Sequence, residues 1–244
     1  MSQGFFFTLV TQPLYNGVVI LMHALPWADL GVIVVVFTVI VRFILFPLAQ
    51  KALRTQMAMQ NIQPAMDEVR TKFKNDSARQ AQETMKLYKA YKVNPFASIF
   101  FLLVQIPIIF GLYYMFVRTG LPEIHPDFLY SFVSNPGSIS TMFLGFLDVA
   151  QKSIPLAVLA GVSQFFQAYF MKAPEVGSKK GFGADFAKSM SLQMKYVFPV
   201  IIVFISYALP ASVALYWTTS NLFSIAQEGM IRKKLDTEKV VSSK

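Results

Sequence analysis

The segment from Asp29 to Leu48 places the strongest constraint on how this chain can fold, because its only charged side chain after Asp29 is Arg42. About 20 such residues in a helix cross the hydrocarbon core of a bilayer, which is roughly 30 Å thick. The rest of the chain has the same character, since 55% of its 244 residues are hydrophobic and only 14% are charged. Soluble domains carry roughly 25% charged residues. The sequence therefore predicts an all-α protein that crosses a membrane several times.

Four further apolar segments predict four further crossings. Two of them, residues 95–117 and 154–171, are single stretches of suitable length. The third stretch, from Tyr196 to Gln227, is too long for one crossing and contains Pro210, which lacks the N–H that a helix interior needs. We interpret it as two spans, 196–209 and 210–227, joined by a tight turn. Together with 29–48, the prediction is five transmembrane helices.

Between the first two spans, residues 49–94 change character and carry nine basic and four acidic side chains. Asn75, Asp76 and Ser77 interrupt two helix-like stretches, and Asp76 or Ser77 can cap the second one. We expect a mobile helical hairpin with few contacts to the spans, which either pairs its own apolar faces or offers a docking surface. A thin apolar stripe follows each arm: Met57, Ile62, Met66, Val69 and Phe73 on the first, and Met85, Leu87, Tyr88 and Tyr91 on the second.

The basic residues predict the orientation, because cytoplasmic loops of membrane proteins are enriched in Lys and Arg. Residues 49–94, 172–195 and 228–244 hold 19 of the 22 Lys and Arg residues. These segments are therefore predicted to form the cytoplasmic hairpin, loop and tail, and 118–153 an external loop. With five spans the N-terminus lies outside and the C-terminus lies in the cytoplasm, or in the matrix or stroma of an organelle.

Residues 1–28 precede the first predicted span and contain no Lys or Arg, unlike the charged start of a secretory signal. Polar residues and prolines interrupt the apolar stretch within them, and Tyr15 and Trp27 suit a membrane boundary. We expect an interfacial helix on the outer face. A sixth crossing over residues 8–26 is the alternative, and it would reverse only the N-terminus.

Arg42 is the one charge inside a span, and such a residue usually faces a bundle interior or a water-filled cavity. The alternative is that its long side chain reaches back to the cytoplasmic headgroups. Other spans also carry polar groups, and four residues of the last one share a helix face. Each polar group alone could simply bond to a neighbouring helix, but together they suggest a hydrated groove: Gln105, Ser163, Gln164, Gln167 and Asn221, with the shared face made of Tyr216, Ser220, Ser224 and Gln227.

Nothing in the sequence is typical of a catalytic site. His23 and His125 are predicted outside the spans, Asp29 and Asp148 lie at span edges, and no metal-ligand or phosphate-loop pattern occurs. We therefore expect no enzyme activity, cofactor or metal. A small-solute transporter or channel is the alternative function, although the two related halves typical of transporters are missing.

In the order and spacing of several segments, the sequence resembles the YidC/Oxa family of membrane protein insertases, in a short bacterial-type form. Phe100 and Phe101 depart from this pattern, because many relatives have a Pro in that stretch. The matching segments are Val41–Arg42–Phe43, Leu87–Tyr88, Val93–Asn94–Pro95, Gln105–Ile106–Pro107, Gly111–Leu112–Tyr113, Phe198–Pro199, Pro210–Ala211, Leu215–Tyr216–Trp217, Asn221 and Gln227.

The resemblance implies an insertase and chaperone of the bacterial plasma membrane. Its intramembrane groove, open to lipid and cytoplasm but closed outside, would receive hydrophobic segments of newly made proteins and release them sideways into lipid. The charge of Arg42 would attract the acidic, hydrophilic terminus of such a protein. Nascent membrane proteins and the bilayer are the implied partners, with the ribosome and a Sec-type translocon as further candidates. The short tail, with five basic residues, is unlike the long basic tails associated with strong ribosome binding. The implied groove residues are Arg42, Gln105, Gln164, Gln167, Tyr216, Trp217, Ser220 and Asn221.

Overall fold

A computed structural model describes residues 4–91, 93–94, 96–170 and 192–242. For residues 96–102, 105 and 235–242 it describes the backbone but not the side chains. The described chain is helical apart from its loops and one two-residue strand pair, β1 (Met142–Phe143) with β2 (Leu147–Asp148). This agrees with the predicted all-α class. Most of the predicted loop 172–195 lies outside the described residues.

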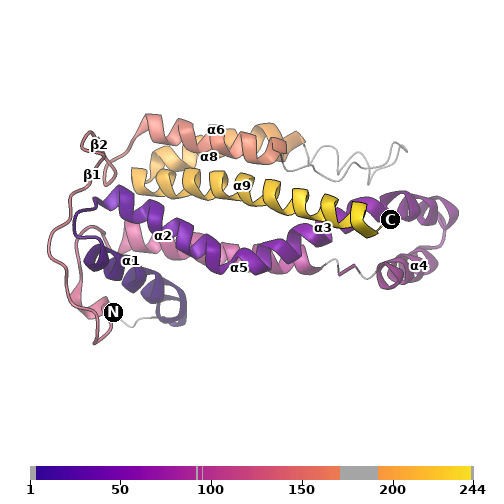
Figure 1. Ribbon diagram of the computed structural model, residues 1–244, viewed down its shortest axis with the longest axis horizontal. Coiled ribbons are helices and arrows are strands. Elements are labelled where there is room, and N and C mark those ends of the chain that lie inside the picture. Colours follow the sequence, from indigo (N-terminus) through magenta and orange to yellow (C-terminus); the bar gives the residue numbers. More distant parts are fainter. Residues whose placement is uncertain (1–3, 92, 95, 171–191, 243–244) are drawn as a thin grey trace.

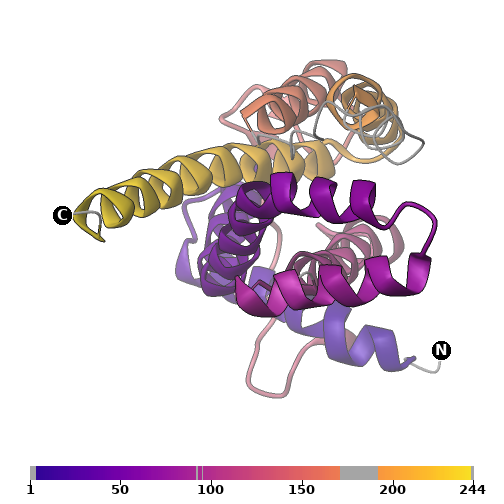
Figure 2. The ribbon, with the colours of Figure 1, turned by 90° about the vertical axis from the view of Figure 1, so that its right-hand side faces the viewer.

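The long helices run side by side along the molecule, while the short hairpin α3–α4 and the C-terminus lie at one end and β1–β2 at the other (Figure 1). Viewed from the hairpin end, α6 and α8 form a pair above α9 (Figure 2). The helices in chain order are α1 (Gln12–Ala24), α2 (Leu30–Ile44), α3 (Phe46–Lys72), α4 (Ser77–Ala90), α5 (Phe96–Tyr113), α6 (Ile154–Phe170), α8 (Phe198–Ala208) and α9 (Ala211–Ser242), with π-helical turns at Phe7–Thr11, Tyr114–Arg118 and Gln193–Val197 and a 3-10 turn at Pro126–Phe128.

The first apolar segment is bent where one straight helix over 29–48 was expected. Asp29 starts α2 by accepting a hydrogen bond from the Val32 amide at 2.9 Å. The helix ends at Ile44, and α3 begins with Pro47 in its first turn. The axes of α2 and α3 differ by 60°. The bend lies at Leu45, because Pro47 cannot donate a hydrogen bond back to the preceding turn.

Within the described residues, no single helix has both the length and the hydropathy of a full membrane crossing. The bent pair α2–α3 meets both conditions together, and three shorter apolar helices fall below the length: Ile106–Arg118, Ile154–Phe170 and Gln193–Ala208. The crossings predicted from sequence are therefore proposals.

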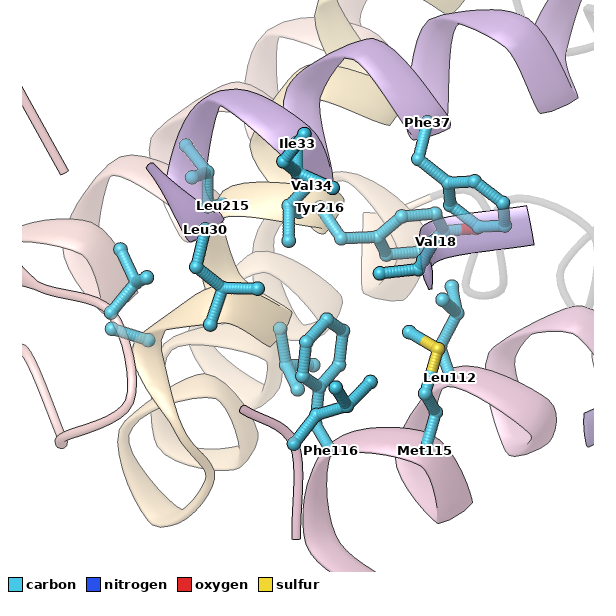
Figure 3. Close-up of a cluster of buried hydrophobic side chains, with 14 of the residues drawn as sticks. Val18, Leu30, Ile33, Val34, Phe37, Leu112, Met115, Phe116, Leu215 and Tyr216 are labelled. Atoms are coloured by element: carbon cyan, nitrogen blue, oxygen red, sulfur yellow. The ribbon is translucent and has the colours of Figure 1, made fainter. Parts of the chain in front are cut away.

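The N-terminal helix is part of the core. Tyr15, Val18 and Val19 on α1 are fully buried. Gly17 allows α1 to approach α2, since a Cβ there would lie 3.0 Å from the Phe37 ring. The shared core joins α1, α2, α9, the end of α5 and the π-helical turn that follows it (Figure 3). Its labelled side chains are Val18, Leu30, Ile33, Val34, Phe37, Leu112, Met115, Phe116, Leu215 and Tyr216.

The charged insert forms two helices, and Asp76 caps the second by accepting from the Arg79 amide at 2.9 Å. Ile62 and Met66 of α3 pack with Leu87 and Tyr88 of α4 in a small separate cluster. Two side chains of the predicted stripes, Met85 and Tyr91, are instead exposed. The first arm also packs against α5, so the insert has more contact with the apolar helices than its composition suggested.

Candidate functional site

Arg42 lies near the C-terminal end of α2 and turns toward α9. Its Nε donates a hydrogen bond to the Ser220 hydroxyl at 2.8 Å, and a terminal guanidinium nitrogen donates to the same oxygen. Ser220 is buried, whereas Arg42 is half-buried. No Asp or Glu in the described part of the chain lies within ion-pair distance of Arg42. The guanidinium thus carries a positive charge whose hydrogen-bond partner is a neutral hydroxyl.

α9 presents two polar faces because residues four apart lie on one side of a helix. Tyr216 and Ser220 face α2, where Tyr216 is buried in the core beside Phe37 (Figure 3). The same side continues to Gln227, which is buried and whose side-chain amide donates to the Phe46 carbonyl at 3.5 Å. This is the face that the sequence predicted from the spacing of Tyr216, Ser220, Ser224 and Gln227.

The second face of α9, made of Trp217 and Asn221, turns toward α6. The Trp217 indole donates to the Gln164 side-chain oxygen at 3.2 Å. One turn further, the Asn221 amide donates to the Ser163 hydroxyl at 3.0 Å, and Ser163 in turn donates to the Ala160 carbonyl at 2.8 Å. These bonds satisfy buried polar groups between two apolar helices, where leaving them unpaired would be costly.

The structure therefore brings six of the eight predicted groove residues into one arrangement centred on α9. Gln167 is half-buried on α6, one turn from Gln164, and has no hydrogen-bond partner among the described residues. The side chain of Gln105 lies outside the described part of α5. Ser163 is one of the polar residues from which the sequence suggested a groove, but it was not among the eight residues implied by the family resemblance. Its role depends on which face of α6 meets α9, which spacing within one helix does not reveal.

Where α2 ends against α9, Phe43 and Phe223 meet edge to face with ring centroids 5.1 Å apart. Glu228 follows on α9, buried and in an ion pair with Arg232 at 2.5 Å. Burial raises the pKa of the Glu228 carboxyl, and the hydrogen bond from Arg232 partly offsets this. Polar side chains on α9 therefore continue from the Arg42 contact at Ser220 to Glu228, where the charged tail starts. Among the described residues, no group of three or more His, Asp or Glu side chains could hold a metal.

The sequence is similar to that of known membrane insertases. The model of the 60Kd inner membrane protein family matches residues 21–239. A membrane protein insertase YidC of Clostridium tetani is 35% identical over 211 residues, which cover 86% of this chain and 84% of that protein. The YidC of Fusobacterium nucleatum is 29% identical, with 84% and 87% covered. The YidC of Syntrophus aciditrophicus is a longer protein: 32% identity extends over 84% of this chain but 33% of the relative.

Proposed function

Because this chain belongs to the 60Kd inner membrane protein family, the family of the YidC insertases, we propose that its polar residues around Arg42 form a substrate groove. The chain is a membrane protein insertase and not an enzyme, and it acts on newly made membrane proteins. The proposed groove is lined by Arg42, Gln105, Gln164, Gln167, Tyr216, Trp217, Ser220 and Asn221. A client would enter from the cytoplasmic side, and its apolar helix would leave sideways into lipid.

The observation that carries this proposal is the unbalanced charge of Arg42. A cation without a carboxylate partner attracts an anion more strongly as the surrounding dielectric constant falls. An acidic hydrophilic tail of a client supplies such an anion. Large apolar and aromatic side chains, among them Phe37 and Tyr216, are buried between Arg42 and the β1–β2 end. The buried hydroxyls of Thr38 and Thr218 in the same region donate to carbonyls of their own helices. The large buried side chains support a groove that is open to the cytoplasm and closed toward the outside.

The distribution of side chains on α6 and α8 supports a bilayer around this groove. Ser163 and Gln164 are buried against α9, whereas the opposite surfaces of the two helices expose large apolar groups. Lipid favours this arrangement because it offers polar groups no partner. The exposed apolar residues include Val158, Leu159, Val162 and Phe166 on α6 and Val200, Ile201, Phe204 and Ile205 on α8.

Five crossings are proposed, over 29–48, 95–117, 154–171, 196–209 and 210–227. Residues 49–94, 172–195 and 228–244 would be cytoplasmic, 118–153 external, and 1–28 would lie at the outer face of the bacterial plasma membrane. The basic tail and hairpin make the ribosome and a Sec-type translocon candidate partners. The separation of the hairpin and the C-terminus from β1–β2 at opposite ends of the molecule (Figure 1) supports this orientation.

Reconstitution tests the function directly. Purified protein in liposomes should insert a newly synthesised single-span protein, so that its tail becomes protected from added protease. Protein-free liposomes give the background, and heat-denatured protein in the same lipid is the control. Equal protection in all three samples would contradict insertase activity.

Labelling at single cysteines tests the orientation, since the chain contains no Cys. A Cys at Glu83 on α4 should react with an impermeant maleimide only after the membrane is opened. A Cys at Glu123 in the proposed external loop should react in intact cells. Both positions are to be compared in detergent, where both should label. Reaction of the Glu83 position from outside would reverse the proposed topology.

A further inference from the structure

The loop between α5 and α6 is bound to the helices along its length. Its first half, residues 123–134, contacts α1, and its second half, residues 140–151, contacts α2 and α9. We name residues 123–151 the strap. Its structure contains little regular backbone pairing of its own, so its contacts with the helices determine where it lies.

The second half of the strap is held mainly through the backbone. The Leu30 amide at the start of α2 donates to the Ser140 carbonyl at 2.8 Å. At the start of α9, the Ala211 and Ser212 amides donate to Gln151 and Val149, both at 2.8 Å. The strap therefore caps the first turns of the two helices that carry Arg42 and Ser220, using amides that a helix start leaves unpaired.

The first half of the strap is held by side chains of α1, with Asn16 at the centre. Asn16 is 1% exposed. Its amide nitrogen donates to the Phe128 carbonyl at 2.9 Å, and its oxygen accepts from the Tyr130 amide at 2.8 Å. The same nitrogen donates to Gln12 of its own helix at 2.9 Å, which orients the side chain. One side chain thus binds a donor and an acceptor of the strap backbone two residues apart.

Neighbouring contacts on α1 extend this attachment. The Tyr15 hydroxyl accepts from the His125 amide at 2.9 Å. The Phe128 ring lies among three other rings, with centroids 4.9 Å from Phe7, 5.9 Å from Tyr15 and 5.4 Å from His125. Within the first half of the strap, Val133 is buried at 8% exposure. The two halves of the strap are therefore attached differently. Side chains of α1 hold the first half, whereas backbone amides at the starts of α2 and α9 hold the second.

We propose that Asn16 is a positioning residue for insertion: it latches the first half of the strap over the outer end of the bundle, and release of this latch lets a client's hydrophilic tail pass outward. The inference rests on the proposed function and orientation. The tail must leave the groove on the side that the core and the strap cover. The half held by side chains can open without disturbing the capped starts of α2 and α9.

Latch opening is measured without a client, by the labelling rate of a Cys at Val133 in the Cys-free chain. Asn16→Ala and Asn16→Leu remove the hydrogen bonds, and Leu retains most of the volume. Both should raise the labelling rate about tenfold, because they leave the Tyr130 amide without its acceptor and the Phe128 carbonyl with only the longer bond from Gln12. A Cys at Val149, fully buried in the second half, should label at its original rate.

Asn135→Ala is the matched control, because Asn135 is an exposed strap residue that accepts only from the Gly137 amide among the bonds described for it. Its labelling rates should equal those of the parent. Unchanged labelling at Val133 in both Asn16 variants would overturn the latch. Equal increases at Val133 and Val149 would also overturn it, by showing general loosening. Running the assay in detergent keeps this result independent of membrane orientation.

The link to insertion is tested with clients that differ only in the length of the translocated tail. Asn16→Ala should speed the protection of long tails about threefold or more and leave short tails unchanged. Faster labelling without any effect of tail length would overturn the role in insertion. Failure of the parent protein to insert either client would instead count against the proposed function, while the labelling result would still decide whether the latch exists.

Discussion

Arg42→Ala should reduce the insertion of clients with acidic translocated tails by about tenfold or more, and that of clients with neutral tails far less. The reason is that no carboxylate among the described residues pairs with Arg42, so its charge is available to an arriving anion. An attraction of about 1.4 kcal/mol corresponds to a factor of ten, and close charges near a protein surface can exceed this value. Insertion efficiency in proteoliposomes, across a series of tails with zero to four acidic residues, measures the effect.

Two variants at the same contact separate charge from structure. Arg42→Lys should keep insertion within about threefold of the parent, because attraction of an acidic tail needs a positive charge more than the planar geometry of the guanidinium. Ser220→Ala removes the hydroxyl that Arg42 contacts but leaves the cation, so it should also retain most of the dependence on tail charge. Protein level and melting temperature are to be measured in parallel.

Three results would contradict charge capture. Identical losses for acidic and neutral tails would show that Arg42 acts on all clients alike. Equal loss of stability in Arg42→Ala and Arg42→Lys would assign the residue a role in folding. No loss in either variant would indicate a side chain that reaches the headgroups without contacting clients. The insertase assignment would stand in each case, because it rests on the family.

The largest loss of stability is expected from Gly161→Ala at the α6–α8 contact. A Cβ at Gly161 would lie 2.3 Å from Val203 Cγ2 and 2.9 Å from the Pro199 carbonyl oxygen. The β-branched valine has little rotamer freedom, and the carbonyl belongs to the helix backbone. Overpacking of this kind costs about 1–3 kcal/mol. For a chain of this size the melting temperature in detergent should fall by roughly 2–10 °C.

Gly229→Ala is the control, because a Cβ at Gly229 meets no atom within 4 Å. Alanine stabilises a helix by about 0.5–1 kcal/mol relative to glycine, so its melting temperature should stay level or rise. Adding Val203→Ala to Gly161→Ala should restore part of the lost stability by removing the nearer clash. Equal melting temperatures for both glycine variants would show that α6 and α8 are not packed this closely.

Local sequence signals predicted several features of the helices well. The first helix of the insert ends at Lys72, and Asp76 caps the next, as its short acceptor side chain suggested. The break between α8 and α9 lies at Leu209 and Pro210. The spacing of Tyr216 and Ser220 predicted one face of α9. These features depend on residues close together in the chain, so the sequence around them contains the information.

Other features depend on contacts between distant segments and could not be predicted in the same way. Nothing near Asn16 identifies its partners at Phe128 and Tyr130, more than a hundred positions away. The pairing of Ser163 with Asn221 depends on the rotation of α6 about its axis. The bend at Leu45 was missed for another reason, since hydropathy continues smoothly through Pro47 and hides the change in helix direction.

α9 continues without a break from Ala211 to Ser242, a length of 32 residues. At 1.5 Å per residue this is about 48 Å, well beyond the roughly 30 Å of a hydrocarbon core. The strap holds its first turn, Arg42 contacts it at Ser220, and its last turns extend away from the other helices (Figure 2). α9 thus links the C-terminal tail to the Arg42 contact and to the strap through one continuous helix, along which a load on the tail would be transmitted.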